Sequence, residues 1–484
     1  MEWIVVIVYG TALLAIFLFS LGQLHLTWVY TRPRRGEPSL FDPEFLPIVT
    51  VQLPIYNEKY VAERLIDCVV RLDYPKEKLE IQVLDDSTDE TVDLIARKVN
   101  FYQSQGFDIR HVQRENRTGF KAGALAYGTD FCKGEFTAIF DSDFLPTTDF
   151  LRRTVGFFVN DKIGMVQTRW GHVNKNYSML TEMQAFGLDA HFTVEQGGRN
   201  RSGSFMNFNG TAGIWRKSCV LDAGGWSADT LTEDLDLSYR AQLRGWQFQF
   251  DESVESPAEL PVIMSAIKSQ QYRWNKGAAE TAKKHLFKVF RSDQSFKTKA
   301  HAAIHLLNSS VFVLLLSASI LSIPMLYIKD ANASLEWLFN LGSLFLIGFF
   351  SIAAFYYVGM KQIEKVNPKL VFLKKFPLFL SFSMGLALHN AIAVMEGFLG
   401  VKTPFVRTPK FNVTNKKESW FGNQYIKPTL TWGILMEGLL CVYFIWGIVS
   451  AWLLHDFGLI IFHIMLAVGF GIVFFHSIKH IKHA

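Results

Sequence analysis

Thr137-Ala-Ile-Phe-Asp-Ser-Asp143 is the stretch that decides how the middle of this chain is interpreted. A short apolar run is followed directly by two carboxylates that flank a serine, a pattern typical of a buried strand that ends in a ligand-binding loop. In open α/β sheets, ligands bind beyond the carboxyl ends of the strands. Asp141 and Asp143 therefore suit Mg²⁺ or Mn²⁺, which would neutralise a diphosphate there. Alone the motif is weak, because any loop can carry two aspartates.

A second apolar run, residues 48–53, leads into Pro54-Ile-Tyr-Asn-Glu58. Tyr56 could stack on a nucleotide base while Glu58 orients that base. The alternative is a simple turn, which the proline and the asparagine of the same motif also favour. Either interpretation places polar side chains at the end of a strand.

A third apolar run, residues 81–84, ends in Asp85-Asp86. A carboxylate at this position can accept a hydrogen bond from a base or a ribose hydroxyl. Helix capping by the polar residues 87–89 is expected as well, and it does not exclude ligand binding. Such apolar runs alternate with charged, helix-like stretches over residues 45–290. The sequence therefore predicts an α/β domain here, and we expect this domain to be the catalytic one.

Two motifs lie later in this domain. Thr232-Glu-Asp234 opens a helix, where an acid can cap the first turn or, alternatively, act as a general base toward an attacking hydroxyl. Gln270-Gln-Tyr-Arg-Trp274 places its amide, guanidinium and indole groups at i, i+3 and i+4 on one helix face. Arginine can pair with a diphosphate and tryptophan can stack on a sugar, although core packing is the simpler role for a single tryptophan.

The composition indicates that part of the chain lies in lipid. Of the 484 residues 49% are hydrophobic, and the mean hydropathy is +0.15, which is high for a soluble protein. The formal net charge of +5 is spread over loops, which makes nucleic acid an unlikely partner. The four cysteines lie far apart in the sequence and predict neither a zinc site nor a disulfide framework.

Long uncharged runs predict transmembrane helices, since a bilayer core takes about 20 apolar residues. After the run 3–30 comes the basic stop Thr31-Arg-Pro-Arg-Arg35, which predicts a cytosolic location for residue 31 onward and disfavours a cleaved signal peptide. Four later runs form two predicted hairpins, 306–328 with 337–360 and 429–454 with 457–475. The apolar segment 376–395 has basic residues on both flanks, with Arg407 and Lys410 among those that follow it, so we expect it to lie in the interface or re-enter, with a sixth span as the alternative.

In chain order, P-x-Y-N-E, D-D-S, D-x-D, T-E-D and Q-x-x-R-W across residues 54–274 resemble the processive family 2 glycosyltransferases, the cellulose synthase superfamily. Three stretches look most like the plant cellulose-synthase-like A and C group, the mannan and glucan synthases. They are His191-Phe-Thr-Val-Glu-Gln196, Asn207-Phe-Asn-Gly-Thr-Ala-Gly213 and Gln270-Gln-Tyr-Arg-Trp274. The resemblance covers residues 45–290.

The resemblance implies an α/β GT-A (Rossmann-like) domain inserted between transmembrane helices, a divalent metal, and inversion at the anomeric carbon. It assigns catalysis to Asp234, with Glu233 beside it, the metal to Asp141 and Asp143, and the acceptor to Trp274. Lys121 could instead be a solvated surface lysine. The residues that it assigns to the nucleotide-sugar are Tyr56, Glu58, Asp85, Asp86, Lys121, Asp141, Gln270 and Arg273.

Phe411-Asn-Val-Thr-Asn-Lys416 fits the F-x-V-T-x-K gating-loop pattern of cellulose synthases. The residues that this resemblance assigns to a cytosolic gating loop are Phe411, Val413, Thr414 and Lys416. The expected domains are an N-terminal transmembrane helix (1–32), a cytosolic catalytic domain (45–290), a transmembrane hairpin (304–360), an interfacial helix with the gating loop (361–428) and a C-terminal transmembrane hairpin (429–484).

The leading hypothesis is processive transfer of a hexose from UDP-glucose or GDP-mannose to a growing β-linked polysaccharide, expected to be β-1,4, with translocation through the chain's own helices. The breadth of the superfamily gives a slight preference for UDP-glucose. The expected partners are the donor, the polysaccharide and membrane lipid, in the inner or plasma membrane or in the Golgi of a eukaryote. The alternatives are a non-processive transferase that makes a glycolipid, and a transporter or scaffold with an inactive domain.

Overall fold

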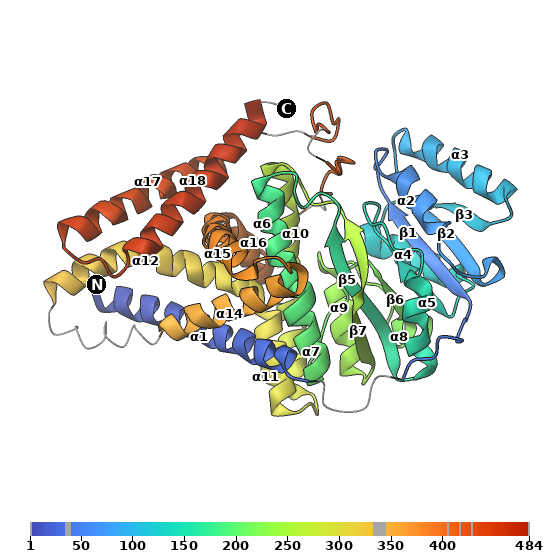
Figure 1. Ribbon diagram of the computed structural model, residues 1–484, viewed down its shortest axis with the longest axis horizontal. Coiled ribbons are helices and arrows are strands. Elements are labelled where there is room, and N and C mark those ends of the chain that lie inside the picture. Colours follow the sequence, from blue (N-terminus) through green and yellow to red (C-terminus); the bar gives the residue numbers. More distant parts are fainter. Residues whose placement is uncertain are drawn as a thin grey trace.

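The computed structural model describes residues 2–33, 40–332, 345–403, 406–415, 418–426 and 429–482. A mixed sheet lies at one end of the molecule and a group of long helices at the other, with α6 and α10 between them (Figure 1). The sheet has the order β3-β2-β1-β4-β6-β5-β7, in which β6 runs antiparallel to both of its neighbours. Its strands are β1 (Val49–Ile55), β2 (Leu79–Asp85), β3 (Asp108–Gln113), β4 (Phe136–Ile139), β5 (Ile163–His172), β6 (Gly213–Arg216) and β7 (Gln247–Ala258).

The strands β1 and β2 are almost entirely buried, and polar side chains of the two strands pair with each other. In β1 and β2, which are parallel, Thr50 lies opposite Glu80 and Gln52 opposite Gln82. Thr50 donates to the Glu80 carboxylate at 2.6 Å, and Gln52 donates to the Gln82 carbonyl at 3.0 Å. These cross-strand pairs allow polar residues to lie in a buried sheet, because a buried polar group without a partner is costly.

Helices cover both faces of the sheet and enclose two hydrophobic clusters. One face packs against α2 (Ala62–Val69), α3 (Thr91–Ser104) and α5 (Phe150–Thr154). The other packs against α4 (Phe120–Phe131), α8 (Lys217–Asp222) and α9 (Glu233–Leu243). The remaining helices of this part are α6 (Met179–Ala190), a π-helical turn (His191–Glu195), α7 (Gln196–Ser202), α10 (Met264–Arg291) and α11 (Phe296–Leu306), with short 3₁₀ turns at Lys76–Lys78, Val155–Val159 and Asn308–Ser310.

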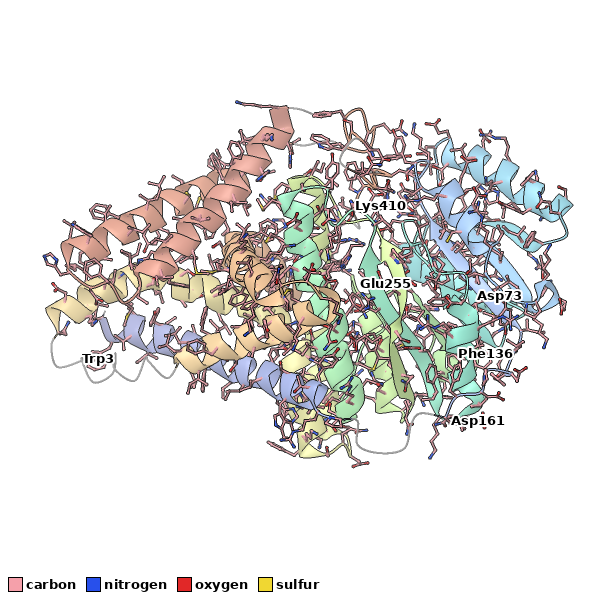
Figure 2. All side chains as sticks on the ribbon, viewed as in Figure 1. Trp3, Asp73, Phe136, Asp161, Glu255 and Lys410 are labelled. Atoms are coloured by element: carbon pink, nitrogen blue, oxygen red, sulfur yellow. The ribbon has the colours of Figure 1, made fainter. Side chains whose placement is uncertain are left out.

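Five helices of the described residues are long and apolar enough to cross a membrane. They are α1 (Glu2–Thr31), α12 (Val311–Ala331), α14 (Phe345–Ile363), α17 (Trp432–Leu453) and α18 (Ile460–Lys482). Large apolar side chains are exposed on them, such as Trp3 on α1, which lies at the end of the molecule far from the sheet (Figure 2). The count agrees with the predicted five spans, while residues 333–344 of the first predicted hairpin lie outside the described residues.

The lysine-flanked segment 376–395 lies within two helices, α15 (Pro368–Gly385) and α16 (Ala387–Leu399). Their axes differ by 50°, so the pair is either a broken span or a re-entrant element. α16 packs along α10 and α15 packs along α18, which places the bend between the catalytic domain and the C-terminal hairpin. All four cysteines are free, as their wide spacing predicted.

Candidate active site

The first half of the site is built where β1, β2 and β4 end at the same edge of the sheet. A pocket there is lined by the predicted residues Tyr56, Glu58, Asp86, Lys121, Asp141, Asp143 and Arg273. Parallel pairing of the three strands brings these ends together, although they are separated by many residues in the sequence.

Of the predicted Asp pair, only Asp86 lines this pocket. Asp86 forms a bidentate ion pair with Arg114, at 2.9 and 2.5 Å. Asp85 is buried, and its oxygens are engaged by the His111 ring at 2.7 Å and by the backbone N–H of Ser87 at 2.9 Å. The structure thus brings Asp86 to the pocket and holds Asp85 in the interior.

Tyr56 lies beneath the guanidinium group of Arg117, to which sequence reasoning assigned no role, although residues 117–123 match a basic loop of the family pattern. The Arg117 guanidinium carbon is 3.4 Å from the centre of the Tyr56 ring. Arg114, which pairs with Asp86, also donates to the backbone carbonyls of Thr118 at 2.9 Å and Phe120 at 3.1 Å. Arg114 therefore fixes the loop that presents Arg117 and the start of α4 to the pocket.

Lys121 is a pocket residue rather than a solvated one. Its ammonium group lies 2.5 Å from Asp141, donates to the Gly210 carbonyl at 2.9 Å and is 3.9 Å from Glu233. Burial acts to lower the pKa of Lys121, but Asp141 and Glu233 outweigh burial and raise that pKa. Lys121 thus remains charged and links the pocket at the strand ends to the Thr232-Glu-Asp234 motif.

Asp143 has the surroundings of a metal ligand. It is 2% exposed, and its Oδ1 has no hydrogen-bond partner among the described residues. Oδ2 lies 2.7 Å from the Lys410 ammonium group. No group of three or more His, Cys, Asp or Glu in the described chain is arranged to hold a metal ion by itself. Asp141 and Asp143 therefore fit Mg²⁺ or Mn²⁺ that takes its other ligands from a diphosphate and water, as these ions commonly do.

Asp234 lies at the start of α9, with Glu233 next to it. Burial, and after it the charge of Glu233, raises the pKa of Asp234 to about 7, while Lys121 acts in the opposite direction. Oδ1 accepts the N–H of Leu235 at 2.8 Å. A carboxyl group with a pKa near neutrality is suited to general-base chemistry.

The predicted helix-face motif lies on α10 and completes a cavity with the acids. This cavity is lined by Lys121, Asp141, Asp143, Glu233, Asp234, Gln270, Arg273 and Trp274. Two further cavities, of about 300 and 240 Å³, share Trp274 with it. The second of these reaches Phe312 of α12, Tyr356 of α14 and Asn390 of α16. Trp274 thus stands between the acids and the membrane-type helices.

The gating motif packs beside the site. Phe411 and Val413 are buried against Val262, Ile263, Ala266 and Trp420. Thr414 hydrogen-bonds to Glu418 and does not line the pocket at the strand ends, and Lys416 lies outside the described residues.

Residues 407–410, which directly precede the gating motif, contact polar side chains of the pocket at the strand ends. Arg407 pairs with Glu58 at 2.8 Å, Thr408 accepts a hydrogen bond from Arg273 at 3.1 Å, and Lys410 contacts Asp143. Figure 2 shows Lys410 at the edge of the sheet that carries the site. Sequence reasoning treated these cations only as cytosolic flanks, although their position directly before the gating motif was an available signal.

Known proteins share the domain that carries this site. Residues 47–277 match the family described as glycosyltransferase like family 2. Glucomannan 4-beta-mannosyltransferase 1 of Oryza sativa subsp. japonica is 43% identical over 260 residues, which cover 52% of this chain and 50% of the relative. Glucomannan 4-beta-mannosyltransferase 2 of Arabidopsis thaliana is 42% identical over 272 residues, which cover 55% of this chain and 50% of the relative. The chain thus spans about half the length of these curated relatives.

Among solved structures, the mannosyltransferase PcManGT from Pyrobaculum calidifontis, in complex with GDP-Man and Mn²⁺, superposes with a TM-score of 0.56 at 19% identity. The match covers 83% of this chain and 100% of that one, and it shows a shared fold. The predicted α/β fold between membrane-type helices, and the resemblance to the cellulose synthase superfamily, are therefore confirmed.

Proposed function

We propose that the chain transfers mannose from GDP-mannose to a growing β-linked polysaccharide, because residues 47–277 match the family described as glycosyltransferase like family 2. One observation carries this proposal: acids and cations from residues 121–274 line a single cavity. The relatives named glucomannan 4-beta-mannosyltransferase favour a mannosyl donor over UDP-glucose and favour β-1,4 linkage. The PcManGT complex holds this same kind of donor.

Asp234 is the general base of the proposed reaction. It accepts the proton of the acceptor hydroxyl while that oxygen attacks the anomeric carbon, the bond to the nucleoside diphosphate breaks, and the configuration inverts. Arg273 and Lys121 face the developing charge on the diphosphate. Mg²⁺ or Mn²⁺ at Asp141 and Asp143, when bound, supplies further charge neutralisation. Tyr56, Glu58 and Asp86 hold the nucleoside from the strand ends.

A long acceptor is favoured by the cavities beyond Trp274. Together these cavities extend from Asp234 to the helices α12, α14 and α16. Translocation of a polymer would require such a continuous path from the site to the membrane-type helices. Asn390, on α16, is fully buried, and its amide atoms have no hydrogen-bond partner among the described residues. An amide in such a cavity is suited to the hydroxyls of a sugar, because buried polar groups are costly unless they are hydrogen-bonded.

Product formation by the purified chain in detergent tests the proposal. GDP-mannose and UDP-glucose are supplied in parallel with Mn²⁺ or Mg²⁺, and the products are digested with endo-β-mannanase and endo-β-glucanase. We expect a mannanase-sensitive polymer that EDTA abolishes, and a fall in rate of at least about 10²-fold in Asp234→Asn, because general-base catalysis contributes about that much or more. A single-sugar glycolipid would favour the non-processive alternative, and no turnover with either donor would refute the proposal.

A further inference from the structure

Two cationic side chains of the segment 406–411 contact carboxylates of the pocket at the strand ends, which is called the donor pocket from here on. Arg407 pairs with Glu58, and the Lys410 ammonium group lies 2.7 Å from Oδ2 of Asp143. Both cations line the same pocket as Asp141 and Arg273. The segment therefore supplies positive charge to the place where a cation and an anionic donor are expected.

The backbone around Lys410 is held firmly in this position. The buried carboxylate of Glu259 accepts the N–H of Phe411 at 2.8 Å and the N–H of Asn412 at 2.9 Å. The Asn423 amide donates to the carbonyl of Lys410 at 2.9 Å. Because the main chain that directly follows the Lys410 side chain is fixed by these three hydrogen bonds, contact with Asp143 can change through side-chain rotation alone.

Asp143 cannot serve Lys410 and a dication equally well. The carboxylate is almost fully buried, one oxygen contacts the ammonium group, and the other has no hydrogen-bond partner among the described residues. A divalent cation on this carboxylate would stand within a few ångströms of a positive charge, in surroundings that screen charge poorly. One of the two cations must therefore move.

The other nearby lysine differs from Lys410. Lys121 contacts Asp141, belongs to α4 and also donates to the Gly210 carbonyl, so the catalytic domain itself positions it. Lys410 comes from a separate part of the chain, and the position of its ammonium group depends on Asp143. The donor diphosphate would offer that group new oxygen partners in the same pocket.

We propose that Lys410 and the divalent metal compete for the Asp143 carboxylate. Lys410 holds Asp143 in the donor-free protein, and its ammonium group moves from the carboxylate to the diphosphate when metal and donor bind. This inference rests on the proposed function, because it takes the nucleoside diphosphate donor from there. It predicts that Lys410 weakens metal binding without nucleotide and strengthens nucleotide binding once metal is present.

Metal affinity tests the first half of the proposal. Free Mn²⁺ is measured by electron paramagnetic resonance with the EDTA-treated, detergent-purified full chain, and the relevant binding is the part that Asp143→Asn abolishes. We expect Lys410→Met to bind Mn²⁺ about tenfold more tightly than the unsubstituted chain, a typical coupling between two sites. Lys410→Arg keeps the charge and should resemble the unsubstituted chain. Arg407→Met removes a cation of the same segment that pairs with Glu58, and should change Mn²⁺ affinity by no more than about twofold.

Nucleotide affinity tests the second half of the proposal, for which the same substitution should weaken binding rather than strengthen it. At saturating Mn²⁺, we expect Lys410→Met to bind GDP about tenfold more weakly, through loss of a charge-assisted contact. Unchanged or weaker Mn²⁺ binding in Lys410→Met, tighter binding of both ligands, or no Mn²⁺ binding that depends on Asp143 would overturn the proposal. A role of Lys410 in stability alone would not give effects of opposite sign.

Amine labelling of the unsubstituted chain provides a test without any variant. Peptide mass spectrometry should show Lys410 labelled faster with Mn²⁺ alone than without it, and protected again by Mn²⁺ with GDP. Equal labelling in the three conditions would contradict the exchange. Because these readouts need no turnover, a chain that makes no polymer can still show the competition, and an active chain can still fail to show it.

Discussion

At the level of single residues, the neighbouring carboxyl groups of Glu233 and Asp234 are important because burial and the negative charge of Glu233 both act on Asp234. Both carboxyl groups lie at the first turn of α9, and the Lys121 ammonium group lies 3.9 Å from Glu233. Burial and Glu233 together raise the pKa of Asp234 to about 7. A base of this pKa is partly protonated near neutral pH, so the chemistry of this residue should be visible in a pH profile.

We expect kcat/KM for sugar transfer to rise with pH and to reach half of its limit near pH 7. Below that pH Asp234 is protonated and cannot accept the proton of the acceptor, and above it the carboxylate form predominates. Glu233→Gln removes the neighbouring negative charge, which lowers the pKa of Asp234 and shifts the acidic limb to lower pH. Initial rates from pH 5 to 9 measure both effects. An acidic limb that Glu233→Gln does not move would argue against Asp234 as its source.

Among the elements, α9 is held so that its first turn stays in the site. Asp236, one turn into the helix, is fully buried, with the His285 ring at 2.6 Å, Lys284 at 2.7 Å and Arg240 at 2.8 Å. Burial acts to raise the pKa of Asp236, but the hydrogen bonds from His285 and Lys284 outweigh burial and hold that pKa below its usual value. Two of these partners belong to α10, so Asp236 fixes the base-bearing helix to the helix that carries Arg273 and Trp274.

Asp236→Ala should lower the free energy of unfolding by about 3 kcal/mol, because it removes the counter-charge of the partly buried Lys284 and Arg240 and leaves the buried His285 ring without this hydrogen bond. Asp161→Ala, at an exposed carboxyl group 3.9 Å from Arg216, is the control and should change stability by less than about 1 kcal/mol. Thermal unfolding in detergent measures both. The contribution of Asp236 is present above the unfolded carboxyl pKa of about 3.9 and is lost as the pH falls below it. Equal stability of the two variants would show that Asp236 does not anchor α9.

Across the whole molecule, α10 lies between the catalytic domain and the membrane-type helices, as α6 does (Figure 1). One of its faces carries Gln270, Arg273 and Trp274 into the site. Another face, at i, i+4 and i+8, carries Lys268, Tyr272 and Lys276 toward α16, α17 and α18. Lys268 pairs with Glu437 of α17 at 2.7 Å and donates to Ser477 of α18 at 3.0 Å. Both charged groups are largely buried, so the pair connects the C-terminal hairpin to the motif helix.

Glu437→Ala should destabilise the chain by about 3 kcal/mol and reduce sugar transfer, because it leaves the Lys268 ammonium group buried without a partner. The double variant Lys268→Met/Glu437→Leu removes both charges and should recover most of the stability. Thermal unfolding and initial rates are measured for Glu437→Ala and for Lys268→Met, Glu437→Leu and the double variant, the last three of which form a double-mutant cycle. Strictly additive effects would show that the two side chains do not act as a pair.

Much of this architecture is determined by local sequence alone. The apolar runs that end in Asp86, Asp141 and Glu58 predicted the strand ends of the site, since a strand buried on both faces must be apolar and its loop must be polar. The length of the uncharged runs predicted five spans, because bilayer thickness fixes the length of a helix that crosses it. The motif order predicted the family that residues 47–277 match, which is described as glycosyltransferase like family 2.

Only the tertiary structure decided which side chains meet. Asp85 and Asp86 are equivalent in the sequence, but His111 on the neighbouring strand holds the first in the interior and Arg114 holds the second at the pocket. Lys410 meets Asp143 across 267 residues of chain, and no local pattern encodes that contact. The strands and spans were predictable because they depend on nearest neighbours and on the thickness of lipid, whereas the charge pairs of the site depend on how separate elements pack.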